Sequence, residues 1–153
     1  MDPSHPPQTP PPPLEPRGFF FGIRVRPVIL GAVVDYVATH ILIVLYLFAS
    51  LGKDGGVSEE ALEKALRDTL SSQDGLFTLL LIGALGTILG GYIAGRMAKI
   101  EEVKHGALVG AASLILGALQ AGASEVESLV PYWYQLLGYL LAIPAGALGG
   151  YLA

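Results

Sequence analysis

Apolar residues gather in four long runs that are separated by short polar stretches. The runs cover residues 27–51, 76–98, 103–122 and 129–153. A helix rises 1.5 Å per residue, so about 20 apolar residues cross a hydrocarbon core about 30 Å thick. None of the runs alternates apolar and polar positions as a half-buried strand does. The pattern therefore predicts an all-α integral membrane protein, with four spans forming a four-helix bundle of two helical hairpins.

The segment before the first apolar run is rich in proline. Residues 1–18 include the run Pro10–Pro13, which lacks backbone donors and holds φ at about −65°. A segment of this kind forms neither helix nor sheet, so we expect a disordered cytoplasmic tail. Its PxxP spacing is also typical of SH3 ligands, which leaves a peptide-recognition role open beside that of a solvated spacer.

The connection between the first two apolar runs has the pattern of a short amphipathic helix. Ser58 can cap its beginning. One face then carries leucines at fourfold spacing, at Leu62, Leu66 and Leu70. We expect a helix over about 58–71 in this first outer loop. Its apolar stripe either packs over the bundle or lies on the membrane surface, and its acidic polar face favours packing.

Composition supports the membrane class and argues against several others. The chain is 52% hydrophobic and 14% charged, which lies well outside the usual soluble mix. Its 9 basic and 13 acidic side chains form no basic surface that would suit a nucleic-acid partner. The chain has no cysteine, so it has no disulfides, thiolate nucleophiles or cysteine metal ligands. We expect one domain whose main partner is the lipid bilayer.

Lysine and arginine concentrate in two segments, which we place inside because short loops rich in them stay on the cytoplasmic side. These basic residues precede the first run or lie around the turn between the second and third runs: Arg17, Arg24, Arg26, Arg96, Lys99 and Lys104. The connection before the fourth run carries Glu125 and Glu127, no basic residue, and an aromatic belt at 132–134. Lys53, Lys64 and Arg67 in the first outer connection weaken the asymmetry, although acidic residues outnumber them there. The pattern predicts a multi-pass plasma-membrane protein with both termini cytoplasmic.

Small residues recur at every fourth position inside the last three runs. Lipid gives apolar helices no hydrophobic reason to associate, and small side chains let two backbones come into van der Waals contact. The positions that we expect at helix contacts are Gly91, Gly95, Gly106, Gly110, Gly138, Ala142, Gly146 and Gly150. The last four form an unbroken stripe on one span, which we interpret as a glycine zipper buried against other helices.

Polar side chains inside the first run form a candidate intramembrane site. Asp35 lies about 12 Å along the helix from Pro27, and His40 lies near the midplane. A charged group at the bilayer centre costs about 2.5–3.5 kcal/mol, so neither residue should face lipid. Thr39 shares a helical stripe with Asp35, whereas His40 lies about 140° around the helix from it.

Residues on the second run extend this candidate site. Tyr92 brings a hydroxyl near the depth of Asp35, and Arg96 lies one turn closer to the cytoplasm. Two states of Asp35 stay open: a neutral carboxyl that donates a hydrogen bond, and a charged one paired with Arg96. Two roles also stay open, a site for a proton or ion, and a polar contact that fixes helix register for about 0.6 kcal/mol.

One sequence signature goes beyond general membrane character. The sequence GGYIAGR at 90–96 is followed by HGA at 105–107, which leads into a glycine-spaced span. These residues resemble those of small four-span prokaryotic membrane proteins of unknown function. The resemblance covers roughly the last three spans and implies membership of a membrane-protein family, without implying a substrate or activity.

The sequence contains none of the catalytic motifs that we sought. It lacks a G-x-S-x-G elbow, an H-E-x-x-H zinc pair and a phosphate-binding loop. Asp35 is the one carboxylate well inside a run, and an intramembrane aspartyl protease needs two. We expect no enzyme, metal or cofactor. The first hypothesis is a structural or interaction protein that assembles with itself or a membrane partner through its glycine faces; the alternative is a small proton- or ion-linked transporter or channel that uses Asp35 with His40.

Overall fold

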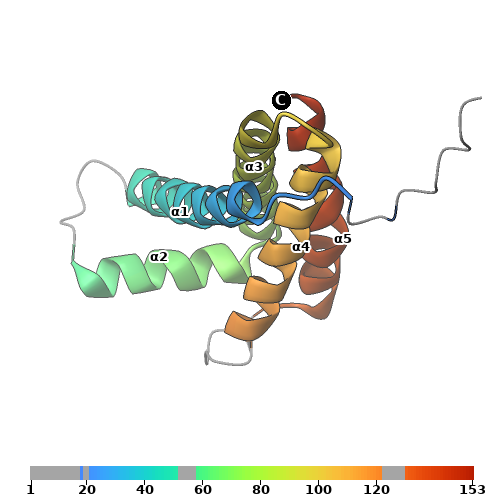
Figure 1. Cartoon of the computed structure of the whole chain (residues 1–153). Coiled ribbons are helices and arrows are strands. Elements are labelled where there is room, and N and C mark those ends of the chain that lie inside the picture. The colour runs from blue at the N-terminus through green and yellow to red at the C-terminus, as the bar shows by residue number, and fades with distance from the viewer. Residues whose placement is uncertain (1–17, 19–20, 52–57, 122–129) are drawn as a thin grey trace, which may run out of the picture.

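The computed structural model describes residues 18, 21–51, 58–121 and 130–153, and within them the fold is entirely α-helical (Figure 1). The helices are α1 (Val25–Ser50), α2 (Glu59–Ser71), α3 (Gln73–Ala98), α4 (Glu102–Ala121) and α5 (Tyr132–Tyr151). The prediction of an all-α fold is confirmed. The proline-rich tail lies outside the described residues.

Four long helices, α1, α3, α4 and α5, pack against one another, and neighbours along the chain run in opposite directions. The short turn after Ala98 makes α3 and α4 an antiparallel hairpin, and α5 runs back along α4. α1 lies against α3 and, over a shorter stretch, against α4. In Figure 1, α1 is inclined to α4 and α5, and α2 runs beside it.

Large apolar side chains cover the outside of the long helices. α1, α3 and α4 are long and apolar enough to cross a membrane, and they are the three such helices among the described residues. α5 is not one of them, because aromatic and polar residues in its first turn lower its mean hydropathy. Its outer face is apolar nonetheless, with exposed side chains at Leu136, Leu137, Leu140, Leu141, Ile143 and Leu148.

Glycines form the contacts between α4 and α5. A β-carbon placed on Gly110 would lie 2.8 Å from the Ala142 carbonyl carbon, and one on Gly106 would lie 2.8 Å from the Gly150 nitrogen. One on Gly146 would lie 2.8 Å from the Gly110 nitrogen and closer still to the Gly106 carbonyl oxygen. Ordinary carbon contacts are about 3.5–4.0 Å, so the two backbones touch directly.

The same kind of contact joins α3 to α5. A β-carbon on Gly91 would lie 3.0 Å from the carbonyl carbon of Gly146, and one on Gly95 would lie 2.6 Å from the side chain of Ala153. Gly146 therefore packs against two helices at once. The chain's own helices occupy these glycine positions, at the end where α3 turns into α4.

α1 joins this packing through a pair of glycines. A β-carbon on Gly31 would lie 2.6 Å from the Gly90 carbonyl oxygen, and one on Gly90 would lie 2.7 Å from the β-carbon of Asp35. Neither glycine is among the contact positions predicted above. We call the half of the molecule that holds Gly31, Gly90 and the α3–α5 and α4–α5 contacts the glycine-packed end.

Three other glycines have no such contact. A β-carbon on Gly83 or Gly117 would meet nothing within 4 Å, and one on Gly138 would meet only a side-chain carbon of Leu80, at 3.9 Å. Gly138 was expected at a helix contact, and instead the close packing of its stripe begins at Ala142. The helices thus diverge beyond the glycine-packed end.

His105 fastens the beginning of α1 to the beginning of α4. Its side chain is fully buried, and its Nε2 accepts a hydrogen bond from the Arg24 backbone N–H at 2.9 Å. Its Nδ1 lies 2.9 Å from the Glu101 carbonyl oxygen, so this nitrogen carries the proton and donates it. Both ring nitrogens are satisfied, and the residue acts in packing at the glycine-packed end.

The turn between α3 and α4 adopts an unusual backbone without glycine. Lys99 and Glu101 have φ values of 57° and 49°, in the left-handed region. Lys99 ends α3 by donating its backbone N–H to the Gly95 carbonyl oxygen at 3.0 Å. This turn brings the two helices close enough for their glycines to meet α5.

α2 occupies the position expected of the amphipathic helix. The Ser58 hydroxyl accepts a hydrogen bond from the Ala61 N–H at 3.2 Å, which caps its first turn. Leu70 is buried with Leu76 and Leu79 of α3, and Leu66 packs against this cluster. The C-terminal part of α2 therefore packs over the end of the long helices opposite the glycine-packed end.

Two matched glycine substitutions test the packing. Gly146→Leu should lower the stability by about 3 kcal/mol or more, because the new side chain meets the backbone of α4 at Gly106 and Gly110. Gly117→Leu should leave it within about 0.5 kcal/mol of the original, because its side chain enters open space. The measurement is the thermal midpoint in detergent, followed by the fluorescence of the single tryptophan, Trp133. Equal losses in the two variants would contradict this account of the packing.

Candidate functional site

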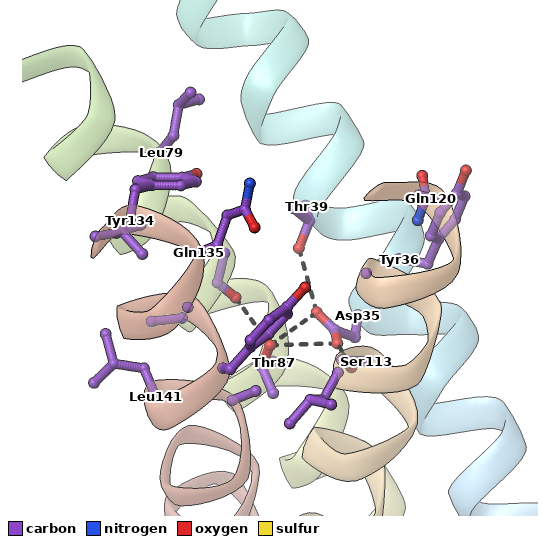
Figure 2. A pocket seen from close by; sticks show the side chains of 18 of the residues that line it. Asp35, Tyr36, Thr39, Leu79, Thr87, Ser113, Gln120, Tyr134, Gln135 and Leu141 are labelled. Carbon is purple, nitrogen blue, oxygen red and sulfur yellow. Dashed lines mark hydrogen bonds between the residues drawn. The ribbon is translucent and has the colours of Figure 1, made fainter. Parts of the chain in front are cut away.

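The diverging helices leave between them an open-sided cavity of about 410 Å³ (Figure 2). It lies between α1, α3, α4 and α5, and much of its wall is leucine, valine, alanine and glycine. The polar side chains that line it are Asp35, Tyr36, Thr39, His40, Thr87, Ser113, Gln120, Tyr134, Gln135 and Tyr139. It extends from Asp35 toward Gln120 and Val130, near the ends of α4 and α5 that face away from the glycine-packed end.

Asp35 lies where the cavity meets the glycine-packed end. It is 5% exposed, and it is ten residues, or about 15 Å, along α1 from Val25. Gly86 and Gly90 of α3 approach it so closely that a β-carbon on Gly86 would lie 3.0 Å from its Oδ1. The carboxyl group therefore forms the floor of the cavity.

Hydroxyl groups from three helices surround this carboxyl group. Thr39 of α1 lies 3.3 Å from Oδ1, and Thr87 of α3 lies 3.3 Å from both carboxyl oxygens. Ser113 of α4 forms a hydrogen bond with Oδ2. Figure 2 shows these bonds converging on Asp35. The site therefore exists only when α1, α3 and α4 are in register.

Two of these hydroxyls have a second acceptor within reach. Thr87 Oγ1 lies 3.0 Å from the Gly83 carbonyl oxygen, and Ser113 Oγ lies 3.0 Å from the Val109 carbonyl oxygen. A hydroxyl has one proton, which it can donate either to Asp35 or to its own helix. With the first choice the site holds a carboxylate, and with the second the hydroxyl oxygens can accept from a neutral carboxyl group.

The partners of Asp35 among the described residues are hydroxyls, without a basic side chain. Arg96, one of the expected partners, instead donates to the carbonyl oxygen of Ala153 at 3.3 Å. Tyr92 is half-buried on α3 and does not line the cavity. The structure therefore separates Tyr92 and Arg96 from the carboxyl group with which the sequence grouped them.

His40 shares the cavity with Asp35 but makes no hydrogen bond to it. Its side chain is exposed, its Nδ1 lies 2.7 Å from the Tyr36 carbonyl oxygen, and its ring centroid lies 4.1 Å from that of Tyr36. This arrangement agrees with the angular separation of the two residues on the helix. His40 is thus a wall residue, and Asp35 is the floor.

Thr87 and Ser113 were not among the residues predicted for the site. The structure places Thr87 beside Asp35, together with Gly86 and Gly90. The available signal was the scarcity of hydroxyls inside the second and third apolar runs. Such residues are candidates for any buried polar contact between spans.

The titratable group at the floor of the site is a single carboxyl group. No group of three or more histidine or acidic side chains that could hold a metal ion occurs in the described part of the chain. One carboxyl group with rotatable hydroxyls accommodates both a charged and a neutral state without moving a helix. Uptake and release of a proton is therefore compatible with this geometry.

Searches against protein-family models, curated proteins and solved structures gave no significant match. The resemblance of residues 90–96 and 105–107 to small four-span membrane proteins therefore stays a prediction.

Two substitutions at Asp35 separate the contribution of its charge to stability from that of its hydrogen bonds. Asp35→Asn should remain within about 1 kcal/mol of the original stability, because an amide keeps an acceptor and gains donors for the three hydroxyls. Asp35→Leu should lose about 1–3 kcal/mol, because those hydroxyls lose their shared partner. Thermal unfolding in detergent measures both. A loss in Asp35→Asn as large as that in Asp35→Leu would mean that the charge itself holds the helices together.

Proposed function

We propose that the protein is a small proton-linked transporter in the membrane. In this proposal the carboxyl group of Asp35 binds and releases the proton. The observation that carries the proposal is a buried carboxyl group, ringed by hydroxyls from three helices, at the floor of a 410 Å³ cavity. Ionisable groups inside a membrane domain are costly, and they mark ion or proton pathways. A polar contact that only fixed helix register would need no adjoining cavity.

The arrangement of the glycines favours this function over assembly with a partner. Gly106, Gly110 and Gly146 already contact backbone within the chain, as do Gly91 and Gly150. The outer faces of the long helices carry large aliphatic side chains, which suit lipid. A homo-oligomer is not required to complete the site, because all of its hydroxyls come from one chain.

The site also favours binding over hydrolysis. Asp35 is the one acidic residue that lines the cavity among the described residues. His40 lines the cavity wall and makes no hydrogen bond to the carboxyl group of Asp35. A binding and exchange function therefore accounts for these residues without a catalytic step.

In the proposed topology α1, α3, α4 and α5 all cross the bilayer, with the glycine-packed end toward the cytoplasm. α5 packs along α3 and α4, and its exposed side chains between the aromatic residues at its two ends are aliphatic, which supports its place as the fourth span. Arg24, Arg96 and Lys99 cluster at the glycine-packed end, in agreement with the rule that basic residues stay inside. α1 has 26 residues, or about 39 Å, so its inclination fits it to a core about 30 Å thick.

Single cysteines test the topology, because the native chain has none. Gln73 and Lys99 are exposed and lie at opposite ends of α3. A membrane-impermeant maleimide should label Gln73→Cys in intact cells, and Lys99→Cys only after the cells are opened. Labelling of both variants in intact cells, or the reverse order, would contradict the orientation.

Proton flux in proteoliposomes tests the function. Under an imposed membrane potential, the protein should carry protons faster than empty liposomes, as followed by an internal pH dye. Asp35→Asn should reduce the flux to the level of empty liposomes at matched incorporation, because an amide does not titrate. Glu63→Gln removes an exposed carboxyl group on α2 and should leave the flux unchanged.

Two results would count against the proposed function. Flux that persists in Asp35→Asn would show that another path carries the protons. Absence of flux above empty liposomes from the unmodified protein would show that Asp35 does not carry protons across the membrane.

A further inference from the structure

The size and wall of the cavity exceed what a proton requires. A volume of about 410 Å³ falls in the range of small-molecule pockets, about 300–1,000 Å³. Its wall is apolar except for Asp35 at the floor, the imidazole of His40, and separated hydroxyl and amide groups. Such a space suits a compact organic molecule with an apolar body.

The charge of the cavity lining determines whether the ligand is a cation or an anion. Asp35 supplies one negative charge when it is ionised. The other titratable groups in the lining are Tyr36 and His40 from α1 and Tyr134 and Tyr139 from α5, while α3 and α4 contribute hydroxyl and amide groups without titratable ones. A carboxylate in a low-dielectric wall is stabilised by one monovalent cation and disfavours an anion.

Aromatic residues select an organic cation over an inorganic one. Tyr36, Tyr134 and Tyr139 line the cavity, and an aromatic face attracts an ammonium group within about 6 Å of its centroid. Hard metal ions instead require oxygen ligands on several sides. Here the carboxyl oxygens lie at the floor, and much of the remaining lining is apolar, as at Leu80, Leu114 and Ala142.

We propose that the cavity binds a lipophilic monovalent organic cation, such as a quaternary ammonium ion with an aromatic arm, and that this cation replaces the proton of Asp35. The inference rests on the proposed function and names its substrate class. The exchange balances: the neutral carboxyl group releases one proton to water, and the resulting carboxylate pairs with one cation. Thr87 and Ser113 then turn their hydroxyl protons from their own helices toward the carboxylate.

Calorimetry with benzyltrimethylammonium chloride tests the proposal on the purified full chain in detergent. Binding should be saturable, with about one cation per chain. Titration in two buffers of different ionisation enthalpy counts the protons released, and about one should leave per cation bound at a pH where Asp35 starts neutral. Asp35→Asn should weaken binding at least about tenfold and release no proton. Gly117→Leu, which fills part of the cavity, should also weaken binding while the protein stays folded.

A further variant and a competing ion test which group releases the proton and whether the site prefers an organic cation. His40→Gln should retain the proton release, which separates Asp35 from the histidine that lines the same cavity. Sodium chloride at the same concentration should not displace the organic cation. Equal binding by Asp35→Asn, or displacement by sodium, would overturn the proposal. Proton flux that depends on Asp35, together with no saturable binding of the organic cation, would overturn this inference and leave the proposed function standing.

Discussion

Direct contact between backbones at glycine is the interaction on which the rest of the structure depends. Gly146 of α5 touches α3 and α4 at once, and Gly31 of α1 meets Gly90 of α3. Apolar helices in lipid gain nothing from burying more apolar surface, so dispersion contacts at short range must hold them together. These contacts need the smallest residues, and this explains why glycine and alanine fill the interior of the glycine-packed end while most leucines and isoleucines of the long helices face outward.

The cavity follows from the same constraint. Where glycines oppose backbone, the helices close completely, and Asp35 lies at the last such contact, beside Gly90. Beyond it Gly83, Gly117 and Gly138 have no backbone opposite them, so their missing side chains leave space. Glycine thus allows close helix packing in one half of the molecule, where backbone lies opposite it, and leaves open space in the other half, where no backbone does. The carboxyl group is held at the boundary, where the seal fixes its position and the cavity gives access to it.

Much of the helical architecture could be predicted from the sequence, because it depends on local pattern. Apolar runs predicted the long helices, and Ser58 with the leucines that follow it predicted α2. Asp35 stood out because a carboxyl group is rare in an apolar run. The meeting of Thr87 and Ser113 at Asp35 depends on the register between three helices, which spacing within one helix does not contain.

Other features were hidden for related reasons. The left-handed Lys99 and Glu101 carry no glycine signal, and the bond from Arg24 to His105 joins residues 81 positions apart. Gly138 shares the spacing of its stripe but faces the cavity, so fourfold spacing alone did not distinguish a contact from a void. Both kinds of error arise because the partner of a residue, rather than the residue itself, decides its role.

The outward placement of the large side chains also bears on how such a chain can drift over evolutionary time. In a soluble domain, large apolar residues interlock in the core and change slowly, whereas the surface varies freely. Here most of the large apolar residues on the long helices face outward, where leucine, isoleucine, valine and phenylalanine can replace one another with little effect on a neighbour. The residues at Gly90, Gly106 and Gly146 have no larger substitute. Distant relatives of this chain would therefore share a sparse set of small residues and little else, a pattern too thin for overall sequence identity to detect.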